Sequence, residues 1–112
     1  MPKTTLKNIP TDAPASLAAL IEPQPHQVVS MSLADSEHVH MTLFSFADGE
    51  TVSEEEYPGE TMYYLLEGET TITMGKREHR LQAGEALAVP AHVLHAVGGL
   101  SSFRMLQITI NE

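Results

Sequence analysis

The histidines and glutamates of this 112-residue chain are the residues that could bind a metal or transfer a proton. His38 and His40 form a His-x-His pair, and residues two apart on a strand share a face, so the pair could chelate a metal. We expect it instead on an exposed strand edge, because polar residues surround it. His92 and His95 follow Pro90, and a histidine in such a place can serve as a base or a ligand. The chain has no cysteine, which excludes thiolate metal sites and thiol nucleophiles.

The charge of the chain limits its partners. The formal net charge is −9, with only six Lys and Arg, which argues against nucleic acid and against an anionic membrane surface as partners. No apolar run has the length of a membrane span, and the first residues do not form a secretory signal. We therefore expect a cytoplasmic protein with one domain.

The pattern of short apolar runs and turn residues predicts an all-β fold after a short N-terminal region. Residues 1–25 are expected to form an arm and a short helix, with Asp12 as N-cap and Leu17, Leu20 and Ile21 on one face. Residues 26–112 are expected to form a β-barrel, because many short strands without crossover helices indicate an antiparallel sandwich or barrel. The expected strands are 27–34, 38–46, 51–57, 61–67, 69–74, 77–81, 85–89, 95–98 and 102–110.

The last expected strand is apolar on both faces. One face carries Phe103 and Met105, and the other carries Leu106, Ile108 and Ile110. A sheet with one face in water would alternate more cleanly, so a second cover is expected. Two covers are open: the N-terminal region, or another subunit. Separately, we expect a homodimer built on the doubly apolar strands and the N-terminal arm.

The stretch from Gly49 to Gly99 resembles the two consecutive motifs of the cupin family, in its small RmlC-like form. The glycines and Pro90 keep the family's spacing, and fifteen residues separate the motifs. The resemblance implies a double-stranded β-helix, the jelly-roll barrel of cupins. The residues that fall on the motif positions are Gly49, Glu55, Tyr57, Thr61 and Gly68 in the first motif and Gly84, Pro90, His92, His95 and Gly99 in the second.

Cupins hold a divalent metal with three histidines and one glutamate, and this chain departs from that set. Its residues at those positions are Glu55, Tyr57, Thr61 and His95, so only His95 is retained. Two good ligands are too few for a tight transition-metal site. We therefore expect no cofactor. The alternative is a divalent transition metal held by His95 and Glu55, with help from His40 or His92.

The resemblance also implies that Glu55 and His95 converge inside the barrel, where a carboxylate beside an imidazole could do acid–base chemistry. The predicted function is binding of a small organic molecule. Catalysis is left open, and Glu55 and His95 are the candidate catalytic residues for any acid–base step. The alternatives are a metal-dependent dioxygenase, isomerase or decarboxylase, and a binding module without catalysis. No residue pattern specifies the ligand. The expected pocket residues are Tyr57, Thr61, Tyr63, Leu65, His92, Val97 and Met105.

Overall fold

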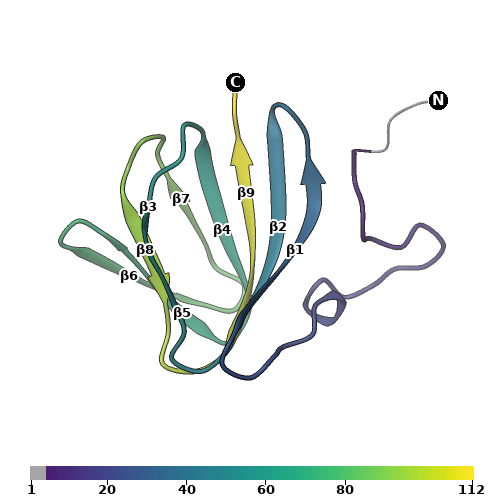
Figure 1. Ribbon diagram of the computed structural model, residues 1–112, viewed down its shortest axis with the longest axis horizontal. Helices are drawn as coiled ribbons and strands as arrows, with labels where there is room; N and C mark the ends of the chain where they lie inside the picture. Colours follow the sequence, from purple (N-terminus) through teal and green to yellow (C-terminus); the bar gives the residue numbers. More distant parts are fainter. Residues whose placement is uncertain (1–4) are drawn as a thin grey trace.

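Two antiparallel sheets pack face to face in the computed structural model, which describes residues 5–112 (Figure 1). One sheet has the strand order β1-β2-β9-β4-β7 and the other has the order β3-β8-β5-β6. The predicted all-β jelly-roll fold is confirmed, and every strand lies within two residues of its expected range. The strands are β1 (Val28–Asp35), β2 (Val39–Phe46), β3 (Thr51–Glu55), β4 (Glu60–Glu67), β5 (Glu69–Met74), β6 (Arg77–Gln82), β7 (Ala86–Val89), β8 (His95–Gly98) and β9 (Phe103–Ile110).

The helix expected near the N-terminus is reduced to a single 3₁₀ turn, η1 (Ala18–Leu20). Leu17 occupies the N-cap position and no side chain caps the turn, so the expected capping by Asp12 is wrong. The physical reason is length, because Pro14 and Pro23 leave too few residues between them to offset the cost of nucleating an α-helix. The first four residues of the expected arm lie outside the described part of the chain.

The N-terminal segment, residues 5–25, covers the outer face of the five-stranded sheet. Ile21 is only 3% exposed and packs with Leu33 of β1, Leu43 of β2 and Leu106 of β9. The segment also runs beside the edge strand β1, where the Lys7 amide donates to the Leu33 carbonyl at 2.8 Å. The second apolar face of β9 thus has a cover within its own chain, which is the first of the two covers expected from sequence.

The space between the sheets is apolar at one end and more polar at the other. Phe46 at the end of β2 stacks on Phe103 at the start of β9, with ring centroids 4.4 Å apart, and closes the apolar end. Further along β9 the inward positions become Gln107 and Thr109. In Figure 1 the polar end is the upper one, where the C-terminus and the β1–β2 turn lie. This gradient leaves room for a site near the upper end.

The glycines and Pro90 lie in the turns between strands, in conformations that suit them. Gly68, between β4 and β5, has a φ of +86°, and a Cβ there would lie 2.6 Å from the Ser102 carbonyl oxygen. Gly84, before β7, also has a left-handed φ, of +91°. Pro90 comes directly after the last residue of β7, where a missing N–H costs little. The glycine and proline positions predicted to shape the turns therefore do so.

No helix in the described part of the chain has the length and hydropathy that a membrane crossing needs.

Candidate small-molecule pocket

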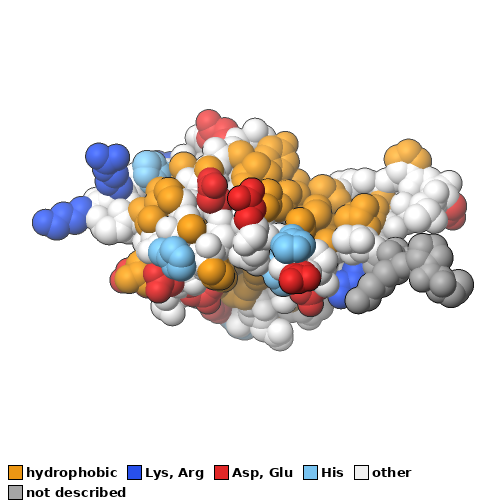
Figure 2. All heavy atoms as spheres, turned by 90° about the horizontal axis from the view of Figure 1, so that it is seen from above, with side chains coloured by type: hydrophobic (Ala, Val, Ile, Leu, Met, Phe, Trp, Pro, Cys, Tyr) orange, Lys and Arg blue, Asp and Glu red, His pale blue; other side chains and the backbone are white. Residues whose placement is uncertain are grey.

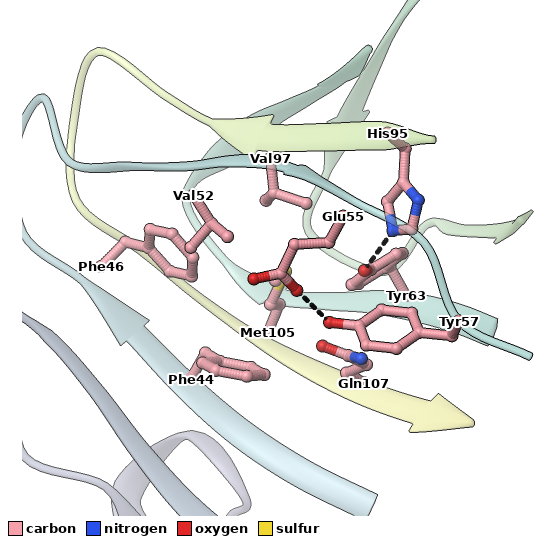
Figure 3. Close-up of a pocket in the computed structure, with 10 residues that line it drawn as sticks. All are labelled: Phe44, Phe46, Val52, Glu55, Tyr57, Tyr63, His95, Val97, Met105 and Gln107. Atoms are coloured by element: carbon pink, nitrogen blue, oxygen red, sulfur yellow. Dashed lines mark hydrogen bonds between the residues drawn. The ribbon is translucent and has the colours of Figure 1, made fainter. Parts of the chain in front are cut away.

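A cavity of about 110 Å³ opens between the two sheets toward the polar end (Figure 3). Its walls are mostly apolar and aromatic, and its polar groups come from β3, β4, β8, β9 and the residues after β3. Concave sites of this composition are typical of small-molecule binding. The lining residues are Phe44, Phe46, Val52, Glu55, Tyr57, Tyr63, His95, Val97, Met105 and Gln107.

His95 is buried at the cavity wall, and its hydrogen bonds define its tautomer. Its Nδ1 lies 2.9 Å from the Val93 carbonyl oxygen. Because a carbonyl can only accept, Nδ1 must carry the proton. In the neutral ring Nε2 is then the acceptor, and the Tyr63 hydroxyl, 2.6 Å away, donates to it (Figure 3). Both ring nitrogens of His95 therefore have partners within the protein.

Tyr63 is held in its protonated form. Burial raises the pKa of the Tyr63 phenol well above its ordinary value of 10.0. The negative charges of Glu55 and, once it ionises, of Tyr57 raise it further. The side chain is 2% exposed. Tyr63 therefore stays protonated at physiological pH and donates a hydrogen bond to His95.

A second pair, Glu55 and Tyr57, lies at the more open side of the cavity. The Tyr57 hydroxyl donates to Oε2 of Glu55. Burial raises the pKa of the Tyr57 phenol, and the hydrogen bond and charge of Glu55 add to this, while a hydrogen bond with Gln107 opposes it. In Figure 3 the other carboxylate oxygen points away from Tyr57, toward the side where Phe44 and Phe46 lie. That oxygen is free to meet a ligand.

A β-bulge turns Glu55 into the cavity. Val52 pairs with Val97 and Glu55 pairs with His95, so three steps along β3 oppose two steps along β8. Without the irregularity, residues an odd number of steps apart would face opposite sides of the sheet. With it, Val52 and Glu55 both line the cavity. Ser53, which simple alternation places on the face of Glu55, does not line the cavity.

The predicted Glu55–His95 pair shares the cavity but not a hydrogen bond. The two residues are register partners on β3 and β8, and both line the cavity. Each side chain bonds a tyrosine rather than the other. The tautomer of His95 is set by the Val93 carbonyl, not by the carboxylate.

The structure places the other expected pocket residues in two groups. Tyr57, Tyr63, Val97 and Met105 line the cavity beside Glu55 and His95. The remaining three lie elsewhere: Thr61 is buried with its hydroxyl 3.0 Å from that of Thr109, Leu65 is part of the apolar core, and His92 is exposed in a loop with a φ of +63°.

Four lining residues are absent from the set expected from sequence. Gln107 could have been found, because it lies two residues after Met105 on β9 and so faces the same side. Phe44 and Phe46 share a face of β2 by the same rule, although nothing in the sequence says which face is inward. Val52 could not be found from the sequence, because the bulge after it breaks the alternation of inward and outward side chains along β3.

The His-x-His pair is not an edge site. β2 lies between β1 and β9, so His40 is on an inner strand and the expectation of an edge is wrong. His40 bonds Asp35 at 2.8 Å, and His38 lies in the β1–β2 turn with Nδ1 3.0 Å from the Asn111 carbonyl oxygen. His40 faces a shallow depression of about 430 Å³ at the mouth, which shares Phe44, Tyr57 and Gln107 with the cavity.

Comparison with known proteins decides the family. A sequence model described as "Cupin domain" matches residues 42–109, more than half of the chain. The chain belongs to the cupin family. This cupin is 50% identical to a cupin superfamily protein from Desulfitobacterium hafniense DCB-2, whose crystal structure it matches with a TM-score of 0.94 over 97% of this chain and 100% of that one.

More distant structures share the fold of this cupin. A conserved protein of unknown function from Streptococcus pyogenes is 24% identical, with a TM-score of 0.93 over 98% of this chain and 96% of that one. The DMSP lyase DddQ from Ruegeria pomeroyi DSS-3 is 19% identical, with a TM-score of 0.68 over 76% of this chain and 47% of that one. The search of curated proteins gave no match. These similarities establish the barrel and leave the chemistry to the residues of the cavity.

The metal site that the family implies does not fit the residues of this cupin. Within residues 5–112, no three His, Asp or Glu side chains are grouped so that they could hold a metal ion. At the four motif positions, Thr61 bonds Thr109, Tyr57 bonds Glu55, and both nitrogens of His95 are bonded to Val93 and Tyr63. A metal would have to displace Tyr63 from His95, and one carboxylate would then be its only other good ligand.

Proposed function

We propose that this cupin binds a small organic molecule in the cavity between its two sheets. The observation that carries the proposal is the composition of the cavity, whose aromatic and aliphatic walls surround a carboxylate with one free oxygen. Membership of the cupin family supports it, because the same barrel hosts many small-molecule sites. The volume of about 110 Å³ is well below the roughly 300–1,000 Å³ of sites for drug-sized ligands, so the ligand has few heavy atoms.

The two hydrogen-bonded pairs would have different roles toward a ligand. Glu55 can accept a hydrogen bond or a proton through its free oxygen, and Tyr57 holds it in place. Tyr63 can accept a hydrogen bond from the ligand, and His95 fixes the orientation of its hydroxyl. If the protein is an enzyme, proton transfer through Glu55 is the chemistry that this arrangement favours, with His95 acting through Tyr63 as a positioning residue.

A cavity-filling variant tests the proposal. Thermal-shift screening of purified protein against small neutral, cationic and anionic molecules should find compounds that raise the melting temperature. Val52→Phe places a larger side chain into the cavity from β3 and should abolish those shifts while the variant itself remains folded. Circular dichroism and the melting curve of the variant establish that it is folded. Equal shifts in Val52→Phe and the parent protein, or no shift with any compound, would contradict the proposal.

The competing function is a metal-dependent cupin enzyme with an atypical ligand set. The observation in its favour is that Glu55 and His95 line one cavity. Tag-free protein, analysed for transition metals by mass spectrometry, distinguishes the two functions. We expect far less than one metal per chain. A bound metal near one per chain that is lost in His95→Ala would establish the metal-dependent alternative.

A further inference from the structure

The charge of the cavity restricts its ligand. Among the described residues that line it, Glu55 is the one carboxylate, and none is a Lys or Arg. The described Lys and Arg side chains lie elsewhere. Arg104 is on the outer face of β9 and donates to the Ala18 carbonyl, Arg80 pairs with Glu69, and Lys76 and Arg77 are at the β5–β6 hairpin. Within residues 5–112, the carboxylate of the cavity therefore has no Lys or Arg beside it.

Aromatic rings lie on both sides of this carboxylate. In Figure 3, Phe44 and Phe46 are on one side of Glu55, and Tyr57 and Tyr63 are on the other. The rings of Phe44 and Phe46 are tilted by 52° with centroids 6.0 Å apart, so they form two walls rather than a flat stack. The face of an aromatic ring attracts a cation, and such walls around a carboxylate are the arrangement that binds alkylated ammonium groups.

From this juxtaposition we propose that the cavity binds a small organic cation with an alkylated ammonium group, between the four aromatic rings and against the free oxygen of Glu55. The proposal rests on the proposed small-molecule function and specifies its ligand class. An anion would have to be desolvated beside Glu55 without a counter-charge. A calcium or magnesium ion would need about six oxygen ligands, and the cavity offers one carboxylate among apolar walls.

The surroundings of the cavity also favour a cationic ligand. Figure 2 looks at the end of the molecule where the cavity opens, and it shows Asp, Glu and His side chains over the middle while Lys and Arg lie mainly toward the two ends. At the mouth, His40 is paired with the carboxylate of Asp35. The formal charge of −9 on the chain also favours the approach of cations over that of anions.

Three probes of similar size separate charge from shape: tetramethylammonium, tert-butanol and pivalate. Each carries a compact, branched apolar group, and they are respectively cationic, neutral and anionic. Binding to the full chain is measured by saturation-transfer NMR and calorimetry at low salt. We expect tetramethylammonium to bind at least about tenfold more tightly than tert-butanol, a difference of about 1.4 kcal/mol, and pivalate not to bind.

Two variants show where the preference arises. Glu55→Gln removes the negative charge but keeps an amide oxygen to which Tyr57 can donate. It should lower the affinity for tetramethylammonium about tenfold and change the affinity for tert-butanol less than about twofold. Glu54→Gln is the matched control, because it removes the same charge from the neighbouring residue, which does not line the cavity. It should leave both affinities unchanged within about twofold.

The outcomes separate this inference from the proposed function. Equal or tighter binding of tert-butanol, lost in Val52→Phe, would overturn the cationic ligand and leave a small-molecule pocket. An equal loss of tetramethylammonium binding in Glu54→Gln and Glu55→Gln would also overturn it, because the effect would then come from net charge alone. Failure of all three probes to bind would count against both proposals.

Discussion

Tyr63 and His95 connect the two sheets of the barrel. Tyr63 is on β4 in the five-stranded sheet and His95 is on β8 in the four-stranded sheet, and their side chains meet in a hydrogen bond of 2.6 Å. The rings meet edge to face, with centroids 5.5 Å apart. Both residues are 2% exposed, so the bond is shielded from bulk water. The pair therefore has a structural role as well as a place in the cavity wall.

Tyr63→Phe should destabilise the protein by about 1–3 kcal/mol, because it leaves Nε2 of His95 as a buried acceptor without a donor. The free energy of unfolding is measured by urea denaturation. Tyr57→Phe is the control, since the partner of Tyr57 is the exposed side chain of Glu55, which water can solvate. We expect that variant to lose less than about 1 kcal/mol. An equal loss in both variants would show that His95 does not depend on Tyr63.

The protein should lose stability in alkaline solution as its buried phenols ionise. The pKa values of Tyr63 and Tyr57 are raised in the folded state above the ordinary 10.0, first of all by burial. Above that pH the unfolded chain loses phenol protons that the folded chain keeps. Stability is therefore complete below about pH 10 and falls as the pH rises, by at most about 1.4 kcal/mol per unit for each tyrosine.

Urea unfolding of the parent and of Tyr63→Phe, between about pH 8 and pH 11, measures this dependence. Ultraviolet difference absorption of tyrosinate follows the ionisation directly. The variant should show a shallower decline, because it lacks one of the two phenols whose pKa is raised. The same decline in both proteins would mean that Tyr63 ionises as readily in the folded state as in the unfolded chain.

The sequence was sufficient for the barrel and insufficient for the geometry of its cavity. Alternation, turn glycines and motif spacing locate all nine strands, because each depends on local chemistry that a linear pattern records. The position of Glu55 depends on a bulge between Val52 and Glu55, which has no sequence signature and reverses the alternation. The bond from Tyr63 to His95 joins residues 32 positions apart on different sheets. Such a contact follows from the packing of the two sheets, not from either strand alone.

Two left-handed glycines provide a matched test of the barrel's turns. Gly84→Ala places a Cβ in open space, so its cost is the strain of a positive φ, about 1–2 kcal/mol. Gly68→Ala carries the same strain, and its Cβ would also lie 2.6 Å from the Ser102 carbonyl oxygen and 2.9 Å from Cβ of Phe103. We expect the Gly68 variant to be less stable than the Gly84 variant in urea denaturation. Equal stabilities would mean that the β8–β9 connection moves aside at little cost.

A homodimer remains our proposal for the assembly of this cupin. The N-terminal segment covers the outer face mainly over β1, β2 and β9, through Ile21 and its neighbours. Toward β4 the outer face keeps exposed apolar side chains, with Met62 38% exposed and Ile110 51% exposed. Burying such a strip against a second copy would remove apolar area from water.

Light scattering at micromolar concentration should give the mass of two chains. Met62→Lys should shift that mass toward one chain, because a charge would be desolvated in the interface. Leu100→Lys is the control: Leu100 is 95% exposed in the β8–β9 connection, away from the strip on β4, and its replacement should leave the mass unchanged. A monomer mass for the parent protein would exclude the dimer, and a dimer that persists in Met62→Lys would place the interface on another face.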